Sequence, residues 1–289
     1  MNGQNKEFIQ LVECPRDAMQ GWKEFIPTSK KIEYLNALLE VGFDTLDFGS
    51  FVSPKAIPQL ADTKEVLSGL IPSKKTKLLA IVANLRGAEE ACAFEQITSV
   101  GFPFSVSETF QKRNTNATIQ TALQTVEQIH NICLIEGKQF VVYLSMAFGN
   151  PYGDPYSKDI VFQWAETMSA MAIPVISLAD TVGLATAEQV STITEYLVKQ
   201  LPTTEIGVHL HSTIYNWQEK IEAAYQSGCR RFDGSLKGIG GCPMAEDALV
   251  GNINTEWMIE WFNDQGVLKP LNVEALLKSG SLAAEIFLN

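Results

Sequence analysis

Residues 173–211 read IPVISLADTVGLATAEQVSTITEYLVKQLPTTEIGVHLH and contain one full repeat of the pattern that decides the fold. The apolar, β-branched runs at Ile173–Ala179 and Glu205–His211 are typical of strands, and Thr186–Lys199 between them has helical periodicity. Asp180 follows the first run, and the second run ends in two histidines. This stretch predicts a strand–helix–strand unit with polar side chains at the carboxyl ends of its strands.

The same alternation extends in both directions along the chain. Further strands are expected at Phe8–Cys14, Phe43–Phe48, Lys77–Val82, Ser99–Phe104, Gln139–Ser145 and Arg230–Ser235. Further helices are expected at Thr28–Val41, where Thr28 can cap the helix and Gly42 can end it, at Asn114–Glu136, Lys158–Met171 and Ile214–Gln226, after Asn254, and over Val273–Leu288. Strands that alternate with helices indicate an α/β protein with a parallel sheet.

Eight such strands in 289 residues predict a (β/α)8 TIM barrel with additional C-terminal helices. The alternative is a doubly wound open sheet, which usually carries a glycine-rich phosphate loop after its first strand. Cys14-Pro15-Arg16-Asp17 is not such a loop. No linker rich in Pro, Gly and Ser divides the chain, so we expect residues 1–289 to form a single catalytic domain.

Composition excludes several classes of protein and of partner. The chain is 46% hydrophobic, which excludes a disordered protein, and its net charge of −11 comes without a cluster of Lys and Arg that would favour nucleic acid. Five unevenly spaced cysteines favour a reducing compartment. The N-terminus lacks a signal or transit pattern, and no run approaches eighteen apolar residues. We therefore expect a cytoplasmic protein with neither a nucleic-acid nor a membrane partner.

Polar residues gather at the predicted strand ends, where a TIM barrel places its functional side chains. These residues are Arg16 and Asp17 at the first strand, Asp47 at the second, Asp180 at the sixth, His209 and His211 at the seventh, and Cys242 and Asn252 after the eighth. The third histidine of the chain, His130, lies in a predicted helix and is expected at the surface.

His209 and His211 carry the strongest signal. Because they lie two residues apart on a strand, both side chains point to the same side of the sheet. Imidazole with carboxylate is a standard ligand set for a divalent metal, and Asp17 and Asn252 lie at neighbouring strand ends. The sequence therefore predicts a metal site, although two hydrogen-bonded histidines in a polar barrel end are the alternative.

The other strand-end residues allow two readings each. Asp17 could be a metal ligand or a helix N-cap, and Arg16 could hold a substrate carbonyl or carboxylate or merely pair with Asp17. Asp47 could be catalytic or a plain turn residue. Cys242 lies in the glycine-rich loop GGCP, which could close over a substrate with the thiol as an acid. Spacing alone favours an incidental thiol in a flexible loop.

These motifs resemble those of the hydroxymethylglutaryl-CoA lyase family, metal-dependent barrel enzymes that cleave carbon–carbon bonds. The resemblance covers nearly the whole chain and includes two loops that are specific to this family, SFVSPK and GGCP. The matching pieces are Pro15-Arg16-Asp17 with Gln20, Ser50–Lys55, Ser107–Phe110, Ser177–Gly183, Val208–His211, Gly240–Pro243 and Gly251-Asn252.

The resemblance implies a role for each of these residues. It implies a divalent metal, Mg or Mn, whose ligands are Asp17, His209, His211 and Asn252. It implies that Arg16 stabilises an enolate oxygen and that Asp17, with His209, accepts a proton. It implies that Cys242 is the catalytic loop cysteine. Asp47 stands where the family has glutamate, and Asp180 matches an aspartate with a supporting part. The implied reaction cleaves 3-hydroxy-3-methylglutaryl-CoA to acetyl-CoA and acetoacetate, and the implied partners are an acyl-CoA substrate and a second copy in a homodimer.

The sequence also departs from the family pattern. Ala18 replaces a glycine, Ser212 replaces the aspartate after the second histidine, Asn150 replaces a cysteine, and the loop from Cys242 to Asn252 is one residue longer. These departures leave two alternatives open. One is a related lyase or aldolase that acts on a different 3-hydroxyacyl-CoA or keto acid, and the other is a catalytically silent barrel that acts as a binding protein.

Overall fold

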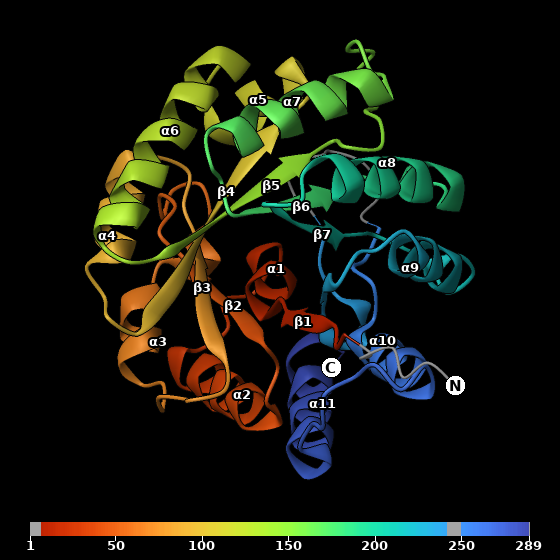
Figure 1. The fold of residues 1–289 in the computed structure, drawn as a ribbon. Helices are drawn as coiled ribbons and strands as arrows, with labels where there is room; N and C mark the ends of the chain where they lie inside the picture. The colour runs from red at the N-terminus through yellow and green to blue at the C-terminus, as the bar shows by residue number, and fades with distance from the viewer. Residues whose placement is uncertain (1–6, 242–249, 289) are drawn as a thin grey trace.

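Eight parallel strands form a closed barrel in the computed structural model, which describes residues 7–241 and 250–288. Each strand pairs with the next, and β8 pairs with β1 to close the barrel (Figure 1). The strands are β1 Gln10–Glu13, β2 Thr45–Ser50, β3 Lys77–Ile81, β4 Ile97–Ser105, β5 Gln139–Ser145, β6 Val175–Ala179, β7 Glu205–His209 and β8 Arg231–Gly234. The predicted (β/α)8 barrel is confirmed, and the open sheet is excluded.

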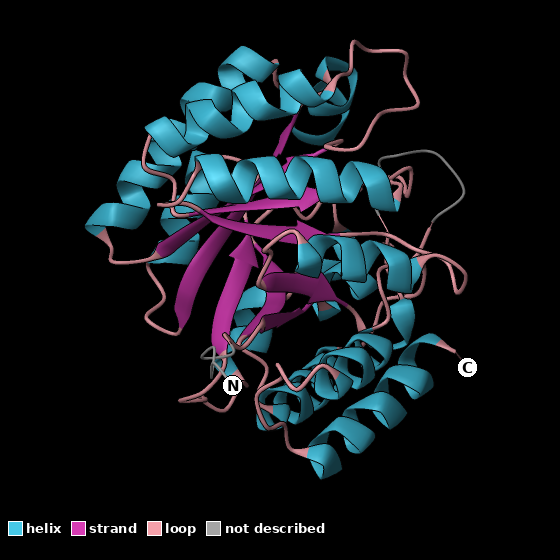
Figure 2. Cartoon of the chain, turned by 45° about the vertical axis from the view of Figure 1, so that its right-hand side comes forward, coloured by secondary structure: helices cyan, strands magenta, loops and turns pink. Residues whose placement is uncertain are grey.

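Helices surround the strands and cover the outside of the barrel (Figure 2). The helices are α1 Pro15–Gln20, α2 Thr28–Val41, α3 Thr63–Ser68, α4 Leu85–Cys92, α5 Glu108–Thr115, α6 Ile119–Ile135, α7 Lys158–Ala170, α8 Ala187–Gln200, α9 Trp217–Gln226, α10 Thr255–Asp264 and α11 Val273–Phe287, with single 3-10 turns at η1 Pro58–Leu60 and η2 Leu236–Gly238. The C-terminal helix α11 packs against α2, which follows the first strand (Figure 1).

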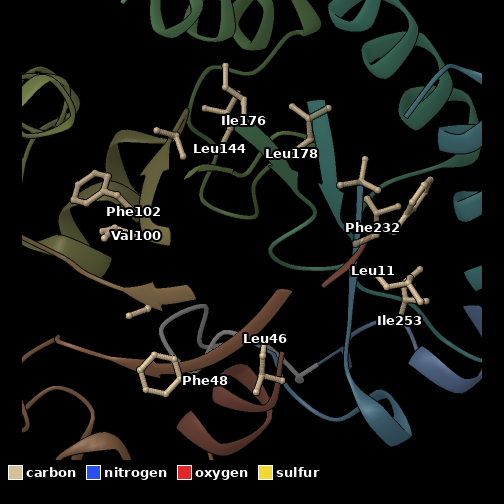
Figure 3. Close-up of a cluster of buried hydrophobic side chains, with 14 of the residues drawn as sticks. Leu11, Leu46, Phe48, Val100, Phe102, Leu144, Ile176, Leu178, Phe232 and Ile253 are labelled. Atoms are coloured by element: carbon tan, nitrogen blue, oxygen red, sulfur yellow. The ribbon is translucent and has the colours of Figure 1, made fainter. Parts of the chain in front are cut away.

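Alternation along each strand decides which side chains reach the barrel interior. Leu46 and Phe48 of β2 belong to the main hydrophobic cluster between strands and helices (Figure 3), so Asp47 between them takes the interior direction. In β7, Val208 belongs to the same cluster and His209 takes the interior direction. In β2 and β7, apolar residues are therefore buried outward and a polar residue points inward, toward the site, whereas β3, β5 and β6 contribute a second apolar cluster that includes Leu79, Val141 and Val175.

The first and seventh predicted strands end earlier than expected, each just before a residue of the site. The first ends at Glu13, and Arg16 and Asp17 lie instead in the first turns of α1, after the N-cap residue Cys14. Asp17 is therefore a helical residue rather than an N-cap. The seventh strand ends at His209, and His211 lies beyond it. Both strands end at the barrel rim, so the polar residues that follow them are not held in strand pairing.

Helix boundaries follow local capping more closely than periodicity. Helix α2 ends at Gly42, as predicted, with a left-handed φ of +90°. Thr28 does not cap α2, however, because its hydroxyl donates to Asp62 instead. The single helix predicted over 114–136 is two helices, because Asn116 ends α5 with a φ of +54° and Thr118 caps α6. The short helices α3 and α4 were not predicted.

His130 lies in α6 and is only 6% exposed, so the prediction of a surface position is wrong. Its ring stacks on Phe140 of β5 with a centroid distance of 6.1 Å, because this face of α6 packs on the barrel.

The four described cysteines are free thiols, at Cys14, Cys92, Cys133 and Cys229. None of the helices within residues 7–241 and 250–288 is long and apolar enough to span a membrane.

Glu13 joins the end of β1 to both sides of the segment that follows β8. Its carboxylate accepts hydrogen bonds from the Leu236 N–H at 2.8 Å and from the Thr255 hydroxyl at 2.5 Å, and it is fully buried. Burial raises the pKa of Glu13 to about 8, although the two hydrogen bonds act in the opposite direction. The carboxyl group is therefore mostly neutral in the folded protein at neutral pH.

This shift makes the stability of the fold depend on pH. Between the ordinary pKa of 4.5 and about 8, the folded protein holds a proton on Glu13 that the unfolded chain loses, so the stabilisation present below pH 4.5 declines as pH rises. We expect this decline to approach about 1.4 kcal/mol per pH unit. Glu13→Gln should lack this contribution. In denaturant unfolding at pH 5, 6.5 and 8, the free energy of unfolding of the variant should therefore rise relative to that of the wild type as pH increases. Parallel pH profiles would contradict the assignment.

Candidate active site

The structure brings together the four residues predicted as metal ligands. Asp17, His209 and His211 each offer one ligand atom, and these three atoms lie within 4.8 Å of one another. The amide of Asn252 donates a hydrogen bond to Asp17 Oδ2 at 2.7 Å. All four side chains are buried. A carboxylate, two imidazoles and an amide thus meet at one rim of the barrel.

A short antiparallel bridge aligns His211 with Asn252. The Ser212 N–H donates to Gly251 at 2.9 Å, and the Ile253 N–H donates to Leu210 at 3.2 Å. His211 and Asn252 are therefore the residues directly opposite each other between the two hydrogen bonds. In such a non-hydrogen-bonded pair the two side chains lie close together on one face. The bridge thus places an imidazole and an amide side by side.

Asp233 orients the imidazole of His209. The two residues are register partners on β7 and β8, and Asp233 Oδ2 lies 3.3 Å from His209 Nδ1. A proton on Nδ1 directed at this carboxylate leaves Nε2 free to bind a cation, the arrangement typical of histidine ligands. Burial works against a charged ring, but the hydrogen bond to Asp233 and the charge of Asp17 outweigh it and raise the pKa of His209.

The electrostatics around Asp17 and His211 favour the protonation states that a metal requires. Burial opposes the charge of Asp17, yet Arg16, the two histidines and Asn252 outweigh it and lower the pKa of Asp17 to about 2. Burial, followed by the proximity of His209, lowers the pKa of His211 to about 3. At neutral pH the cluster therefore holds an ionised carboxylate and a neutral imidazole.

One buried oxygen supports the fit of these residues to a dication. Asn252 Oδ1 has no hydrogen-bond partner among the residues that the structure describes, although the side chain is 3% exposed. A buried carbonyl oxygen without a partner is costly unless a cation or water satisfies it. Together with the carboxylate of Asp17 and the two imidazoles it forms a mixed oxygen and nitrogen donor set of the kind that holds divalent metal ions.

Arg16 lies beside the cluster and is held by two carboxylates. Asp47 accepts from its Nε at 3.0 Å and from its Nη2 at 2.6 Å, and Asp17 Oδ1 accepts from Nη1 at 3.2 Å. Gln20 accepts a second hydrogen bond from Nη1 at 2.8 Å. Burial raises the pKa of Asp47, and Arg16 offsets only part of this effect. Asp47 thus contacts Arg16 rather than the ligand cluster. Its two hydrogen bonds with Arg16 orient the guanidinium.

Gly240 gives the ligand cluster room where the chain leaves η2. Its φ is +130°, and a Cβ atom built on it would lie 2.1 Å from Asn252 Nδ2 and 2.8 Å from Asp17 Oδ2. Real Cβ atoms do not approach other atoms this closely. A side chain at this position must therefore displace two of the four proposed ligands.

We expect Gly240→Ala to fold but to bind Mn²⁺ at least about 10-fold more weakly, because outer contacts of ligands change metal affinity by this much or more. Isothermal titration calorimetry with Mn²⁺ measures the effect. Gly137→Ala is a matched control, since Gly137 also has a positive φ, +64°, but a Cβ there meets nothing within 4 Å. Equal Mn²⁺ affinity in the two variants would show that Gly240 does not shape the cluster.

A cleft of about 920 Å³, including the part open to solvent, is lined on one side by Arg16 and by Asp17, His209 and His211 of the cluster. Its other walls are largely apolar and are formed by Val52, Ala56, Ile57, Ile81, Ala83, Pro103, Phe110 and Ala179. Tyr143 also lines the cleft, and its buried hydroxyl has no hydrogen-bond partner in the described part of the chain. The cleft therefore offers polar groups at one side and an apolar surface for a carbon skeleton.

Several residues of the site were not predicted from the sequence. Asp233 could have been found, because it alternates with the apolar Phe232 in a predicted strand next to the histidines. Tyr143 lies in a predicted strand without any polar neighbour to single it out. Lys220, which bonds to Asp180 and to the backbone of His211, lies in a predicted helix and gave no signal. Cys242 lies outside the described residues.

Comparisons with known proteins agree with this geometry. The family model described as HMGL-like matches residues 9–282. The cytoplasmic 3-hydroxy-3-methylglutaryl-CoA lyase of Rattus norvegicus is 32% identical over 95% of this chain and 80% of its own length. The mitochondrial hydroxymethylglutaryl-CoA lyase of Mus musculus is 31% identical over 96% of this chain and 85% of its own length.

The solved structures include a close match across the whole chain. An HMG-CoA lyase from Acinetobacter baumannii, in complex with coenzyme A and 3-methylmalate, superposes with a TM-score of 0.92 at 31% sequence identity. The match covers 100% of this chain and 94% of that one. The chain therefore belongs to the HMGL-like family.

Proposed function

We propose that this chain is a carbon–carbon lyase that cleaves 3-hydroxy-3-methylglutaryl-CoA into acetyl-CoA and acetoacetate with the help of Mg²⁺ or Mn²⁺. The observation that carries the proposal is the convergence of Asp17, His209, His211 and Asn252 beside Arg16 in one cleft. The names of the relatives in rat, mouse and Acinetobacter baumannii support the substrate. The intact ligand set favours an enzyme over a silent barrel.

The first step removes the proton of the 3-hydroxyl group. A dication bound by the four ligands supplies Lewis acidity, which makes this hydroxyl more acidic. Asp17 is ionised at neutral pH, since its pKa is about 2, and a carboxylate that binds a metal through one oxygen keeps a basic lone pair on the other. His209 would have both ring nitrogens engaged, Nδ1 by Asp233 and Nε2 by the metal. We therefore place the departing proton on Asp17, with His209 as its neighbour.

Breaking the C2–C3 bond then transfers the electron pair to the thioester. The C3 oxygen becomes the ketone of acetoacetate, and the thioester becomes the enolate of acetyl-CoA. Arg16 is oriented by Asp47 and can donate a charge-assisted hydrogen bond to the enolate oxygen. Asp47 acts in this proposal through Arg16.

A proton donor must finally convert the enolate carbon into the methyl group of acetyl-CoA. We assign this step to Cys242 from its GGCP loop, by resemblance to the family. Closure of such a loop over the cleft would exclude water and prevent stray protonation.

Cys242→Ala is expected to fold and to bind Mn²⁺ as the wild type does, while kcat falls by about 100-fold or more, as for loss of a general acid. Steady-state kinetics and Mn²⁺ calorimetry measure the two quantities. Cys229→Ala is a suitable control, because Cys229 is buried and its thiol bonds only to backbone carbonyls of Ile206 and Arg231. An unchanged kcat in Cys242→Ala would remove this thiol from the mechanism.

The decisive experiment is to incubate the purified protein with Mn²⁺ and 3-hydroxy-3-methylglutaryl-CoA and to measure acetoacetate and acetyl-CoA. A parallel panel of other 3-hydroxyacyl-CoA thioesters and keto acids tests the alternative substrates that the Ser212 and loop departures leave open. Equal amounts of both products would support the proposal. Turnover of another substrate only would establish the related lyase instead.

We also propose that the chain works as a single catalytic domain in the cytoplasm, from its undivided sequence and its unevenly spaced cysteines, and as a homodimer, by resemblance to the family. The relatives described as cytoplasmic in rat and mitochondrial in mouse allow either compartment. Analytical ultracentrifugation at assay concentrations tests the dimer, since a monomeric sedimentation coefficient would contradict it.

A further inference from the structure

A fully buried lysine holds the backbone beside the proposed ligands. Lys220 of α9 has 0% exposure, and its Nζ donates to the carbonyl of His211 at 2.7 Å and to Asp180 Oδ2 at 2.8 Å. Asp180 follows β6, and its own N–H donates to the His209 carbonyl at 3.0 Å. Its Oδ1 accepts from the Ala185 N–H at 3.0 Å. One ammonium group thus joins α9 to the ends of β6 and β7.

The backbone geometry explains why a cation is needed at this place. β6 ends at Ala179, which pairs with His209, so the sheet offers no strand amide to the His211 carbonyl. In the bridge with Asn252, the carbonyl of His211 points away from its partner. A buried carbonyl without a donor is costly. Lys220 supplies that donor from the neighbouring helix.

Stability alone does not account for this ion pair. A buried ion pair is often no more stabilising than apolar residues of similar volume, because both charges lose their hydration. Lys220 lies next to the buried Ile221 in α9. An apolar side chain at position 220 would therefore also be packed inside the protein. The Lys220–Asp180 pair joins three backbone segments, α9 and the ends of β6 and β7, directly beside the proposed ligand His211.

We propose that Lys220, paired with Asp180, is a positioning residue for the metal site. It fixes the backbone of His211 and so keeps the imidazole in place beside Asp17 and Asn252. Asp180 compensates the positive charge of Lys220, which would otherwise repel a dication. This inference rests on the metal site of the proposed function.

The test compares Mn²⁺ binding and thermal unfolding in three variants of the full chain. Lys220→Met removes the donor to His211, and Asp180→Asn with Lys220→Met also removes the unpaired carboxylate. Lys31→Met is the matched control, because Lys31 is 1% exposed and its Nζ pairs with Asp62 at 2.7 Å and with the Gln59 carbonyl. Isothermal titration calorimetry measures the Mn²⁺ dissociation constant below the unfolding temperature of each variant.

We expect Lys220→Met and Lys31→Met both to unfold at lower temperature, since each removes the cation that pairs with a carboxylate of low exposure, Asp180 or Asp62. Only Lys220→Met should bind Mn²⁺ more weakly, by about 10-fold or more. The double variant should regain thermal stability without regaining Mn²⁺ affinity, because the His211 carbonyl still lacks its donor. Loss of affinity without recovery in the double variant separates positioning from stability.

Wild-type Mn²⁺ affinity in the folded double variant would overturn the inference, whatever the single variant does. Equal losses of affinity in Lys220→Met and Lys31→Met would also overturn it, because the effect would then be a general consequence of instability. If the wild-type protein bound no Mn²⁺, the metal site itself would fail together with this inference. Mn²⁺ binding by the wild type without lyase activity would refute the proposed substrate and leave the positioning role standing.

Discussion

His211→Ala is expected to abolish Mn²⁺-dependent lyase activity and to raise the Mn²⁺ dissociation constant by more than about 100-fold, a larger effect than substitution of outer contacts produces. Three observations support this expectation. The ligand atom of His211 lies within 4.8 Å of those of Asp17 and His209. The lowered pKa of His211, about 3, keeps the ring neutral at neutral pH. The bridge to Asn252 fixes the backbone, so neighbouring side chains cannot easily replace the missing ligand.

The measurement pairs calorimetry with a continuous assay of acetyl-CoA release. His130→Ala is the matched control, since His130 is also a buried histidine but packs against Phe140 in α6. The control should lose some stability and keep Mn²⁺ affinity. If His211→Ala retained the wild-type Mn²⁺ affinity, the ligand assignment would be wrong. If it lost affinity but kept full activity, the metal would have no part in the reaction.

The position of the site could be predicted because the barrel converts sequence order into spatial order. Asp17 and Asn252 are separated by most of the chain, yet β1 and β8 are neighbours in the closed barrel. The two-residue spacing of His209 and His211 indicated that their side chains point to the same side of the sheet. These two rules suffice to bring carboxylates and imidazoles to one rim.

The contacts around the ligands could not be predicted in the same way. Helix periodicity placed Lys220 in a helix, but only the packing of α9 on the barrel brings its Nζ to Asp180 and the His211 carbonyl. His130 illustrates the same limit, because periodicity does not say which polar residue of a helix faces the barrel. The early ends of β1 and β7 depend on hydrogen bonds to other segments, which no single stretch of sequence contains.

Local departures from the family pattern also needed the structure for their interpretation. Ser212 replaces an aspartate, and its N–H takes part in the bridge that aligns the ligands, by donating to Gly251. Asn150 replaces a cysteine, and its side chain accepts from the Tyr152 and Asp154 N–H groups at 3.1 Å each. The Asn150 side chain therefore organises a backbone turn, whereas the Ser212 bond is made by the backbone and would be kept by an aspartate. Neither substitution removes a proposed ligand, which is why the metal site survives them.

Arg16→Gln is expected to lower kcat by about 100- to 1,000-fold with little change in KM, the effect of removing one donor to a developing oxyanion. Arg16 is the residue that Asp47 and Asp17 orient into the cleft, through hydrogen bonds of 2.6 Å from Nη2 and 3.2 Å from Nη1. Removing the guanidinium leaves Asp47 buried without its partner. Because burial already raises the pKa of Asp47, we expect its carboxyl group to take up a proton, which limits the loss of stability.

The double variant Arg16→Gln with Asp47→Asn separates catalysis from stability. It removes both members of the pair, so its unfolding temperature should lie closer to that of the wild type than that of Arg16→Gln, while kcat stays equally low. Asp47→Asn alone keeps the guanidinium but loses its orientation, and it should show an intermediate kcat. Mn²⁺ binding should persist in all three variants, because Arg16 and Asp47 are not ligands, and it should weaken by no more than about 100-fold where the Arg16 contact to the proposed ligand Asp17 is lost. A rise in KM at unchanged kcat in Arg16→Gln would mean that Arg16 binds the ground state of the substrate, and the enolate role would have to be given up.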